Sequence, residues 1–183
     1  MAGGPQTGEK PGDAREETTL NEKIPGWLQP HREIVNAAAQ KANFPADLIG
    51  AVIFQESGGN LNVILTMNPN GGQDEGLMQV NPETAKELEQ KYPDRFQGLS
   101  GAAKNVMFGA SYLKDMFDSV AEHNYGVTLR AYNSGPNGVD KNDLRALPAG
   151  TGDKTYVDKV LRCWSDISQG RDPPADHYAS EFH

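Results

Sequence analysis

The sequence predicts a mainly α-helical domain, and three observations lead to that prediction. Several segments between residues 29 and 169 place apolar side chains three and four positions apart, which is the period of an amphipathic helix. Proline, asparagine and glycine, which favour helix ends, stand at the limits of these segments. Only Leu61–Thr66 has the composition of a β-strand, and the Asn-Pro-Asn-Gly-Gly that follows allows a small hairpin rather than a sheet-based core.

The first two predicted helices are adjacent in the sequence. Within residues 29–43, the helical spacing is carried by Ile34, Val35, Ala38, Ala39 and Ala42. Pro45 ends this helix, because a proline disfavours helical backbone in the residue before it. The second helix begins at Pro45 or Ala46, and Asp47 complements its N-terminal dipole. Gly58 and Gly59 provide a left-handed stop at its other end.

The remaining helices follow residue 80. Asn81 and Pro82 form an N-cap with proline at the first helical position. A longer helix is predicted from Gly101 to Glu122, with one apolar face made by Val106, Ala110, Leu113, Phe117 and Val120. Residues 127–133 form a further helix, and the last begins near Asp153, with Tyr156, Val160, Trp164 and Ile167 on one face. The prediction is six or seven helices in all.

Length and composition indicate one folded domain with flexible ends. The chain has 183 residues, of which 37% are hydrophobic, enough for a single core. Residues 1–24 and 170–183 are rich in polar residues, glycine and proline without periodicity, so we expect flexible segments on either side of a domain at 25–169. A net charge of -8 argues against nucleic acid as a partner. No apolar run approaches the roughly 20 residues of a membrane-spanning helix, so we expect no membrane insertion.

Glu56 is the first candidate for chemistry. It follows Leu48 and Val52 at steps of four, so the carboxylate continues an apolar stripe on one helix face. A glutamate at a helix end can simply be solvated. Alternatively, apolar neighbours would desolvate the carboxyl group and raise its pKa, which keeps it protonated near neutrality. Such a group can protonate the leaving oxygen of a sugar.

Two later segments hold further candidates. Gly72–Asn81 (G-Q-D-E-G-L-M-Q-V-N) contains Asp74 and Glu75, which are either a second catalytic carboxylate or solvated loop charges. In Arg130–Gly138 (R-A-Y-N-S-G-P-N-G), Tyr132 is a candidate site residue or a core aromatic, and Asn133 a site residue or a helix cap. The four histidines lack ligand spacing and the acidic loop lacks the calcium-binding pattern, so we expect no metal and no cofactor.

Four short motifs together resemble one known family. In order they are E-S-G-G-N, G-L-M-Q-V, A-Y-N-S-G and T-Y-V-D-K-V, and the match covers roughly residues 29–169. The combination resembles the superfamily of soluble lytic transglycosylases and goose-type lysozymes. The resemblance implies a lysozyme-like helical fold, with a small hairpin or irregular loop region beside an active-site cleft. It also implies an enzyme that cleaves the β-1,4 bond between N-acetylmuramic acid and N-acetylglucosamine in peptidoglycan glycan strands.

The resemblance also implies roles for individual residues. Glu56 matches the family's catalytic glutamate, which acts first as acid and then as base. The substrate-binding residues implied by the same motifs are Ser57, Asn70, Met78, Gln79, Tyr132, Asn133 and Tyr156. The hydroxyl group of Tyr156 is expected to lie near Glu56.

Two departures bear on the reaction. The water-holding aspartates of goose-type enzymes are replaced by Asn70 and Asn81, whereas transglycosylases usually carry serine at position 70. A single carboxylate favours a lytic transglycosylase that forms 1,6-anhydro products. Asp74 or Glu75 would support a hydrolytic muramidase or a chitinase instead. An alternative of another class is a non-catalytic wall-binding module of a phage or secretion assembly.

The site of action expected from this resemblance is the bacterial cell wall, in the periplasm or outside the cell. The N-terminus lacks the basic start and apolar middle of a secretory signal. This pattern fits a phage endolysin made in the host cytoplasm and released by a holin, and a bacterial secreted effector would look similar. We expect a monomer.

Overall fold

The computed structural model describes residues 17–60, 64–67, 73–148 and 150–182. Within these residues the predicted mainly α-helical class is confirmed, with seven α-helices, one 3-10 helix and two short strands. Their order is η1 (Gln29–His31), α2 (Arg32–Ala42), α3 (Ala46–Ser57), β1 (Ile64–Met67), β2 (Gln73–Glu75), α4 (Pro82–Lys91), α5 (Pro93–Phe96), α6 (Gly101–Asp118), α7 (Tyr125–Ser134) and α8 (Tyr156–Ser168).

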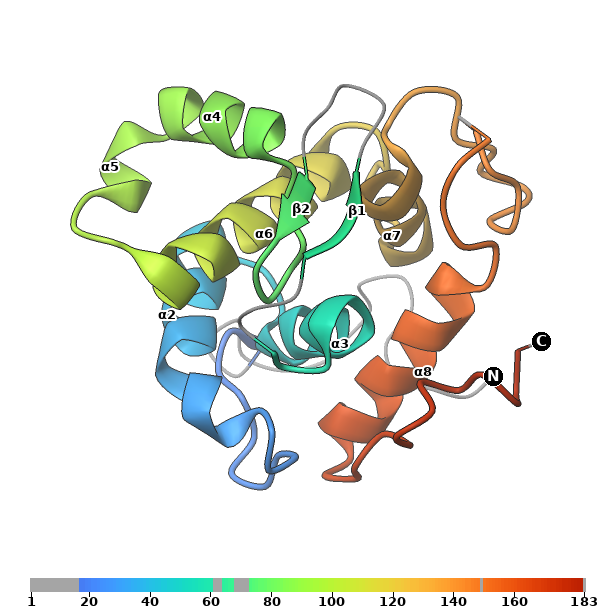
Figure 1. The fold of residues 1–183 in the computed structure, drawn as a ribbon, viewed down its shortest axis with the longest axis horizontal. Helices are drawn as coiled ribbons and strands as arrows, with labels where there is room; N and C mark the ends of the chain where they lie inside the picture. Colours follow the sequence, from blue (N-terminus) through green and yellow to red (C-terminus); the bar gives the residue numbers. More distant parts are fainter. Residues whose placement is uncertain (1–16, 61–63, 68–72, 149, 183) are drawn as a thin grey trace.

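Helix α3 is the centre of the fold. It packs on α8 and α2, while α2 packs on α6 and α6 on α7, so α3 is surrounded by helices (Figure 1). Every residue of α3 from Ala46 to Phe54 is buried, which accounts for its almost continuous apolar sequence. The last three residues, Gln55–Ser57, are only partly buried. The C-terminal end of α3 therefore carries its polar side chains out of the core.

Most helix ends match the signals in the sequence. Gly58 ends α3 with φ +63°. The side chain of Asn81 accepts a hydrogen bond of 2.8 Å from the backbone N–H of Glu83, which confirms the predicted cap of α4. The helix predicted to end at Glu122 ends earlier, at Asp118, because the backbone of Ser119 leaves helical geometry with φ -103° and ψ -83°. Glu122 and His123 then turn the chain with φ values of +48° and +67°. The sequence analysis did not predict η1 or α5 as separate elements.

The predicted hairpin is present beside the end of α3 (Figure 1). Strands β1 and β2 are antiparallel, with Ile64 opposite Glu75 and Met67 opposite Gln73. The pairing is irregular between these two positions. The strand had been predicted at Leu61–Thr66; its first three residues lie outside the described residues.

The buried core extends beyond the predicted limits of the domain at both ends. Leu20 and Ile24, assigned to the segment 1–24, have only 4% and 7% of their surface exposed. Tyr178, in the segment 170–183, is 3% exposed, and its hydroxyl group donates a 2.6 Å hydrogen bond to Asp166 on α8. The ring of His177 stacks on Phe54 at 4.1 Å. Composition misses such segments, because a few apolar side chains are enough to attach a polar stretch to the core.

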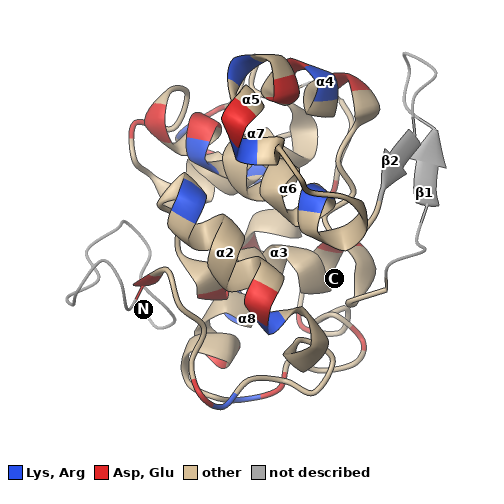
Figure 2. Ribbon diagram, turned by 90° about the vertical axis from the view of Figure 1, so that its left-hand side faces the viewer, with Lys and Arg blue, Asp and Glu red and all other residues tan. Residues whose placement is uncertain are grey.

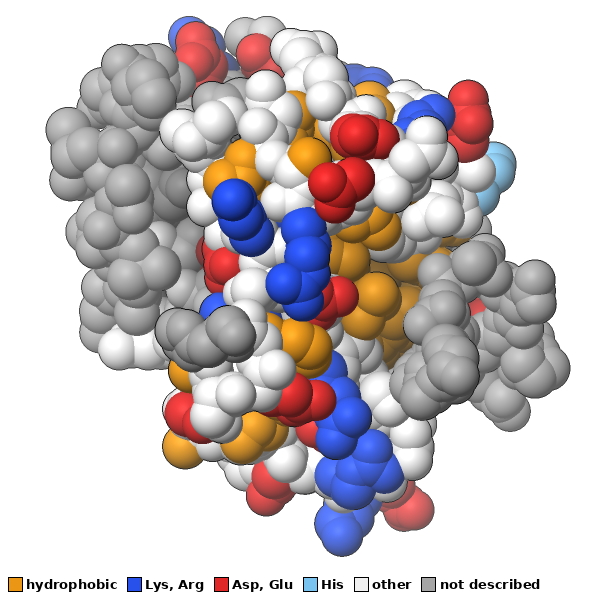
Figure 3. All heavy atoms as spheres, turned by 90° about the vertical axis from the view of Figure 1, so that its right-hand side faces the viewer, with side chains coloured by type: hydrophobic (Ala, Val, Ile, Leu, Met, Phe, Trp, Pro, Cys, Tyr) orange, Lys and Arg blue, Asp and Glu red, His pale blue; other side chains and the backbone are white. Residues whose placement is uncertain are grey.

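Charged side chains of both signs are mixed over the surface. Figure 2 shows Lys, Arg, Asp and Glu interspersed on α4 and α5. On another face, Figure 3 shows Lys and Arg side chains in a broken column with Asp and Glu beside them. Ion pairs of α8 account for part of this mixing, for example Arg145 with Asp158 at 2.6 Å. No helix in the described part of the chain is both long enough and apolar enough to cross a membrane.

Candidate active site

The candidate site is built around the exposed end of α3. Leu48 and Val52 are fully buried, and Glu56 is partly buried one turn further on, as the apolar stripe predicts. The helix stops two residues later at Gly58. The stripe therefore brings a carboxylate from the core to the edge of the domain.

Tyr156, in the first turn of α8, holds this carboxylate. Its hydroxyl group donates a 2.7 Å hydrogen bond to Oε2 of Glu56, although the two residues are 100 positions apart. Only 2% of Tyr156 is exposed. Burial first, and the negative charge of Glu56 second, raise the pKa of the Tyr156 hydroxyl well above its usual value. Tyr156 therefore remains a hydrogen-bond donor to Glu56 throughout the neutral range.

A tight turn at residues 76–79 forms a second part of the site. Gly76 has φ +78°, and a Cβ atom there would lie 2.5 Å from the side chain of Asn105. Asn105 in turn accepts a 2.9 Å hydrogen bond from the backbone N–H of Met78. Gln79, at φ +50°, donates from its side chain to the carbonyl oxygen of Gly76 at 2.7 Å. Only glycine fits position 76, which explains the first letter of the G-L-M-Q motif.

Met78 and Ser57 hold the 76–79 turn against the neighbouring helices. The Met78 side chain is fully buried, and Gly109 on α6 makes room for it, since a Cβ there would lie 2.2 Å from its sulfur. The Ser57 hydroxyl group lies 2.8 Å from the carbonyl oxygen of Leu77 and 3.1 Å from that of Ile53. Ser57 thereby connects the end of α3 to the 76–79 turn.

Tyr132 and Asn133, at the end of α7, complete the group. The Tyr132 hydroxyl group donates a 2.7 Å hydrogen bond to the carbonyl oxygen of Met78. Gln79, Tyr132, Asn133 and the ring of Tyr112 all line a pocket of about 230 Å³. The centroids of the two tyrosine rings are 5.4 Å apart. Aromatic faces beside amide groups are the surfaces that bind sugars by stacking and hydrogen bonding.

The predicted residues thus form two groups, which are held together by hydrogen bonds or line the same pocket. Tyr156 contacts Glu56, while Ser57 and Tyr132 both bind the 76–79 turn. Three predicted residues are not placed in this way. Asn70 lies outside the described residues. Asp74 and Glu75 belong to β2, and the structure describes their backbone only.

Two functional candidates were missed by the sequence analysis. Arg130 on α7 is fully buried and donates a hydrogen bond to the side chain of Asn133. Asp153, in the loop before α8, donates its backbone N–H to the same Asn133 oxygen at 2.9 Å. The spacing of three between Arg130 and Asn133 places them on one helix face. This spacing is the feature of the sequence that could have indicated Arg130.

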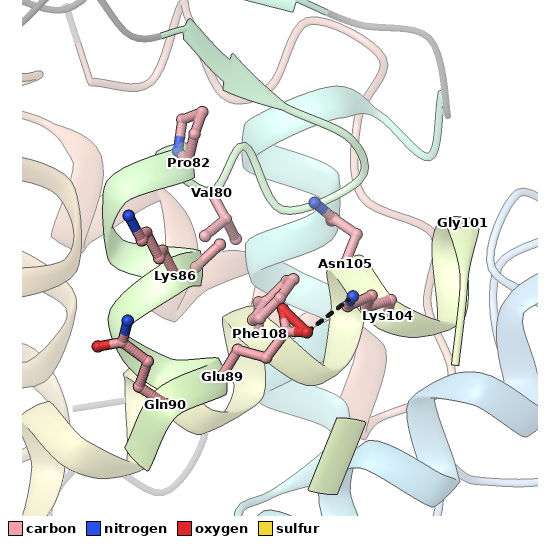
Figure 4. A pocket seen from close by; sticks show the side chains of 10 residues that line it. Val80, Pro82, Lys86, Glu89, Gln90, Gly101, Lys104, Asn105 and Phe108 are labelled. Atoms are coloured by element: carbon pink, nitrogen blue, oxygen red, sulfur yellow. Dashed lines mark hydrogen bonds and ion pairs between the residues drawn. The ribbon is translucent and has the colours of Figure 1, made fainter. Parts of the chain in front are cut away.

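A second pocket lies elsewhere. It has a volume of about 530 Å³ and lies between α4 and α6, with Val80, Ala85 and Phe108 as apolar lining and Lys86 and Lys104 at its edge (Figure 4). None of the predicted site residues whose side chains the structure describes lines it. Within the described residues, no group of three or more His, Cys, Asp or Glu side chains is arranged to hold a metal ion.

Comparison with known proteins gives a family and a fold. The family model described as "Transglycosylase SLT domain" matches residues 33–148. Among solved structures, the lytic transglycosylase Slt from Pseudomonas aeruginosa is 22% identical with a TM-score of 0.61, over 80% of this chain and 26% of that chain. The 70-kDa soluble lytic transglycosylase from Escherichia coli is 21% identical with a TM-score of 0.58, over 80% and 26%.

A third similar structure is the complex of the 70-kDa soluble lytic transglycosylase with bulgecin A. It is 18% identical with a TM-score of 0.57, over 78% of this chain and 24% of that chain. The present chain thus spans about a quarter of the length of these proteins. At these identities the likeness establishes the fold, including the predicted lysozyme-like arrangement of helices.

Proposed function

This chain belongs to the transglycosylase SLT domain family, and on that premise we propose that it cleaves peptidoglycan as a lytic transglycosylase. The bond cut is the β-1,4 bond between N-acetylmuramic acid and N-acetylglucosamine in the glycan strand. The product ends in a 1,6-anhydro ring. The protein acts as a monomer at the bacterial cell wall.

The hydrogen bond between Tyr156 and Glu56 is the observation that carries this proposal. It fixes one carboxyl oxygen of Glu56 at 2.7 Å from a buried phenol and so orients the carboxyl group at the end of α3. The neighbouring pocket, with its tyrosine and amide side chains, supplies surfaces suited to sugar rings. An oriented carboxylate close to such a pocket is what a transglycosylase requires.

In the proposed reaction Glu56 acts twice. It first donates its proton to the glycosidic oxygen, and the bond from that oxygen to the anomeric carbon of the muramic acid breaks. The N-acetyl group of the substrate stabilises the positive charge that develops at this carbon. The 6-hydroxyl oxygen of the same sugar then bonds to the anomeric carbon, and its proton passes to the Glu56 carboxylate. No water is consumed, and the enzyme returns to its protonated state.

Tyr156 assists the second half of this cycle. A hydrogen bond donated to a carboxylate stabilises the ionised form, which is the form that accepts the proton of the 6-hydroxyl group. The same bond fixes the orientation of the Glu56 carboxyl group at the end of α3. The proton donor therefore keeps one position relative to a bound substrate.

The proposal is tested with Glu56→Gln on purified peptidoglycan. We expect solubilisation of the wall to fall by about 10³-fold or more, because general acid and base catalysis are both lost. Glu33→Gln, which changes an exposed glutamate on α2, is the matched control and should retain full activity. Undiminished cleavage by Glu56→Gln would exclude Glu56 as the catalytic group.

Mass spectrometry of the released fragments distinguishes the remaining alternatives. Anhydro ends differ from reducing ends by the mass of one water molecule. Reducing ends that disappear in Asp74→Asn or Glu75→Gln would indicate hydrolysis with a second carboxylate. Tight binding to the wall with no soluble fragments would indicate a binding module. Light scattering during size-exclusion chromatography tests the monomer.

A further inference from the structure

Arg130 is a buried charge within the candidate site region. It lies on α7, three residues before Asn133, and none of its surface is exposed. Arginine is almost never fully buried unless its charge is well partnered, because removing a guanidinium group from water is costly. A fully buried arginine therefore calls for a structural or functional reason.

The guanidinium group of Arg130 donates hydrogen bonds to three residues. One terminal nitrogen donates to the carbonyl oxygens of Leu144 at 3.1 Å and Asp153 at 3.0 Å. The other donates to the side-chain oxygen of Asn133. Two of these partners, Leu144 and Asp153, belong to the irregular segment between α7 and α8. Arg130 thus supplies this segment with hydrogen bonds that a helix or sheet would otherwise provide.

Asp153 links Arg130 to Tyr156 through hydrogen bonds. Its carbonyl oxygen accepts hydrogen bonds from both Arg130 and the backbone N–H of Tyr156, each at 3.0 Å. Its own N–H donates to Asn133 at 2.9 Å. The preceding residue, Gly152, has φ +114°, and a Cβ atom there would lie 2.6 Å from the Asn133 oxygen and 3.3 Å from the guanidinium nitrogen. The chain is therefore held closely around Arg130 immediately before α8 begins.

We propose that Arg130 is a positioning residue that anchors Asp153 and thereby holds the Tyr156 hydroxyl group against Glu56. The catalytic part of this inference rests on the proposed function, whereas the positioning of Tyr156 is independent of it. Arg130 donates hydrogen bonds to Leu144, Asp153 and Asn133. It acts through the hydrogen-bonded path from its guanidinium group to Asp153, Tyr156 and Glu56.

The charge of Arg130 also strengthens the hydrogen bond from Tyr156 to Glu56. Its positive charge lowers the pKa of the Tyr156 hydroxyl, against the larger effect of burial. A nearby cation makes the phenol a stronger hydrogen-bond donor to the carboxylate. Lysine would keep a charge, but its single ammonium group cannot reproduce the planar fork that spans Leu144, Asp153 and Asn133.

The first test reads the position of Tyr156 without any substrate. Tyrosine is labelled with carbon-13 at the ring carbon that bears the hydroxyl group, and Tyr156→Phe assigns its signal. In Arg130→Met this signal should move in the same direction as in Glu56→Gln, which removes the carboxylate acceptor. Arg145→Met, which removes an exposed arginine ion-paired to α8, should leave the signal unchanged. An unchanged signal in Arg130→Met would overturn the proposal.

The second test is a double-mutant cycle on wall cleavage. Arg130→Met should lower kcat by about tenfold or more and change KM by less than about twofold. In a Tyr156→Phe background the same change should lower kcat by less than about threefold further, because its route of action is already lost. Equal losses in both backgrounds would show that Arg130 does not act through Tyr156.

Arg130→Lys keeps the test decisive if Arg130→Met does not fold. It should give an intermediate shift of the Tyr156 signal and an intermediate kcat, and a Tyr156 signal identical to wild type would refute the role of the fork. An unmodified protein that releases no wall fragments would refute the proposed function alone. The labelled signal would still decide the position of Tyr156.

Discussion

The two sides of the candidate site are held by different forces. On one side, α3 brings Glu56 to the surface on a helix whose residues 46–54 are all buried, and all of these except Asp47 are apolar or glycine. On the other side, the end of α7 and the segment before α8 are held by hydrogen bonds to Arg130 and Asn133. Packing energy is spread over many contacts, whereas a buried polar network depends on each member.

The difference predicts how each side tolerates substitution. An apolar helix should accept a change of shape that keeps its volume, because its contacts are numerous and non-directional. The polar side should lose stability with the loss of a single acceptor, because buried donors are left unsatisfied. Both sides must keep their positions for Tyr156 to reach Glu56.

The largest expected effect is on the apolar side. Leu48→Ala should lower the free energy of unfolding by about 3–4 kcal/mol, since Leu48 is fully buried and its loss leaves a cavity. Leu48→Met, which nearly keeps the volume, should cost less than about 1.5 kcal/mol. Urea denaturation followed by circular dichroism measures both values. Similar costs for the two variants would contradict the claim that packing volume is what this side requires.

The next effect is on the polar side. Asn133→Ala should cost about 2 kcal/mol, because Arg130 and the N–H of Asp153 both lose their acceptor. Asn133→Asp keeps an acceptor at the same place and should retain most of the stability. Asn142→Ala, at an exposed position of the same segment, is the control and should change stability by less than about 0.5 kcal/mol.

The Asn133 variants also test whether the polar side needs only an acceptor oxygen at this position. If Asn133→Asp were as unstable as Asn133→Ala, the network would depend on the neutral amide rather than on an acceptor oxygen. Thermal unfolding of the three variants under one condition makes this distinction.

The two sides also differ in how far the sequence predicts them. The helix with Glu56 follows from local signals, namely the spacing of Leu48, Val52 and Glu56 and the stop at Gly58. The G-L-M-Q and A-Y-N motifs predicted their residues through resemblance to a family. The contact from Tyr156 to Glu56 was expected on the same basis, because no periodicity relates residues 100 positions apart.

Apart from Asn133, the polar side was not predicted, for a physical reason. The segment between α7 and α8 has no apolar period, and its conformation depends on a buried arginine that a composition-based analysis assigns to the surface. Even the helix limits depend on such contacts: the last helix was expected near Asp153 and begins at Tyr156. Asp153 instead accepts hydrogen bonds from the backbone N–H and the hydroxyl group of Thr155, at 2.8 and 2.7 Å.

The smallest expected effect is the pH dependence contributed by Asp153. Burial, the largest single influence, raises the pKa of its carboxyl group, but hydrogen bonds from Thr155 and Lys159 together outweigh it and lower the pKa below 3.8. Because the folded pKa lies below the unfolded one, the carboxylate contributes stability above about pH 4 and loses it as pH falls through the folded value. The Asp153 side chain is 38% exposed, so solvent screening limits this contribution to less than about 1 kcal/mol.

Asp153→Asn should therefore lose less stability than wild type between pH 7 and about pH 2.5 in urea titrations. A larger acid-induced loss in Asp153→Asn would mean that the carboxylate does not stabilise the polar side, and that Arg130 and Asn133 hold it through the backbone of residue 153 alone.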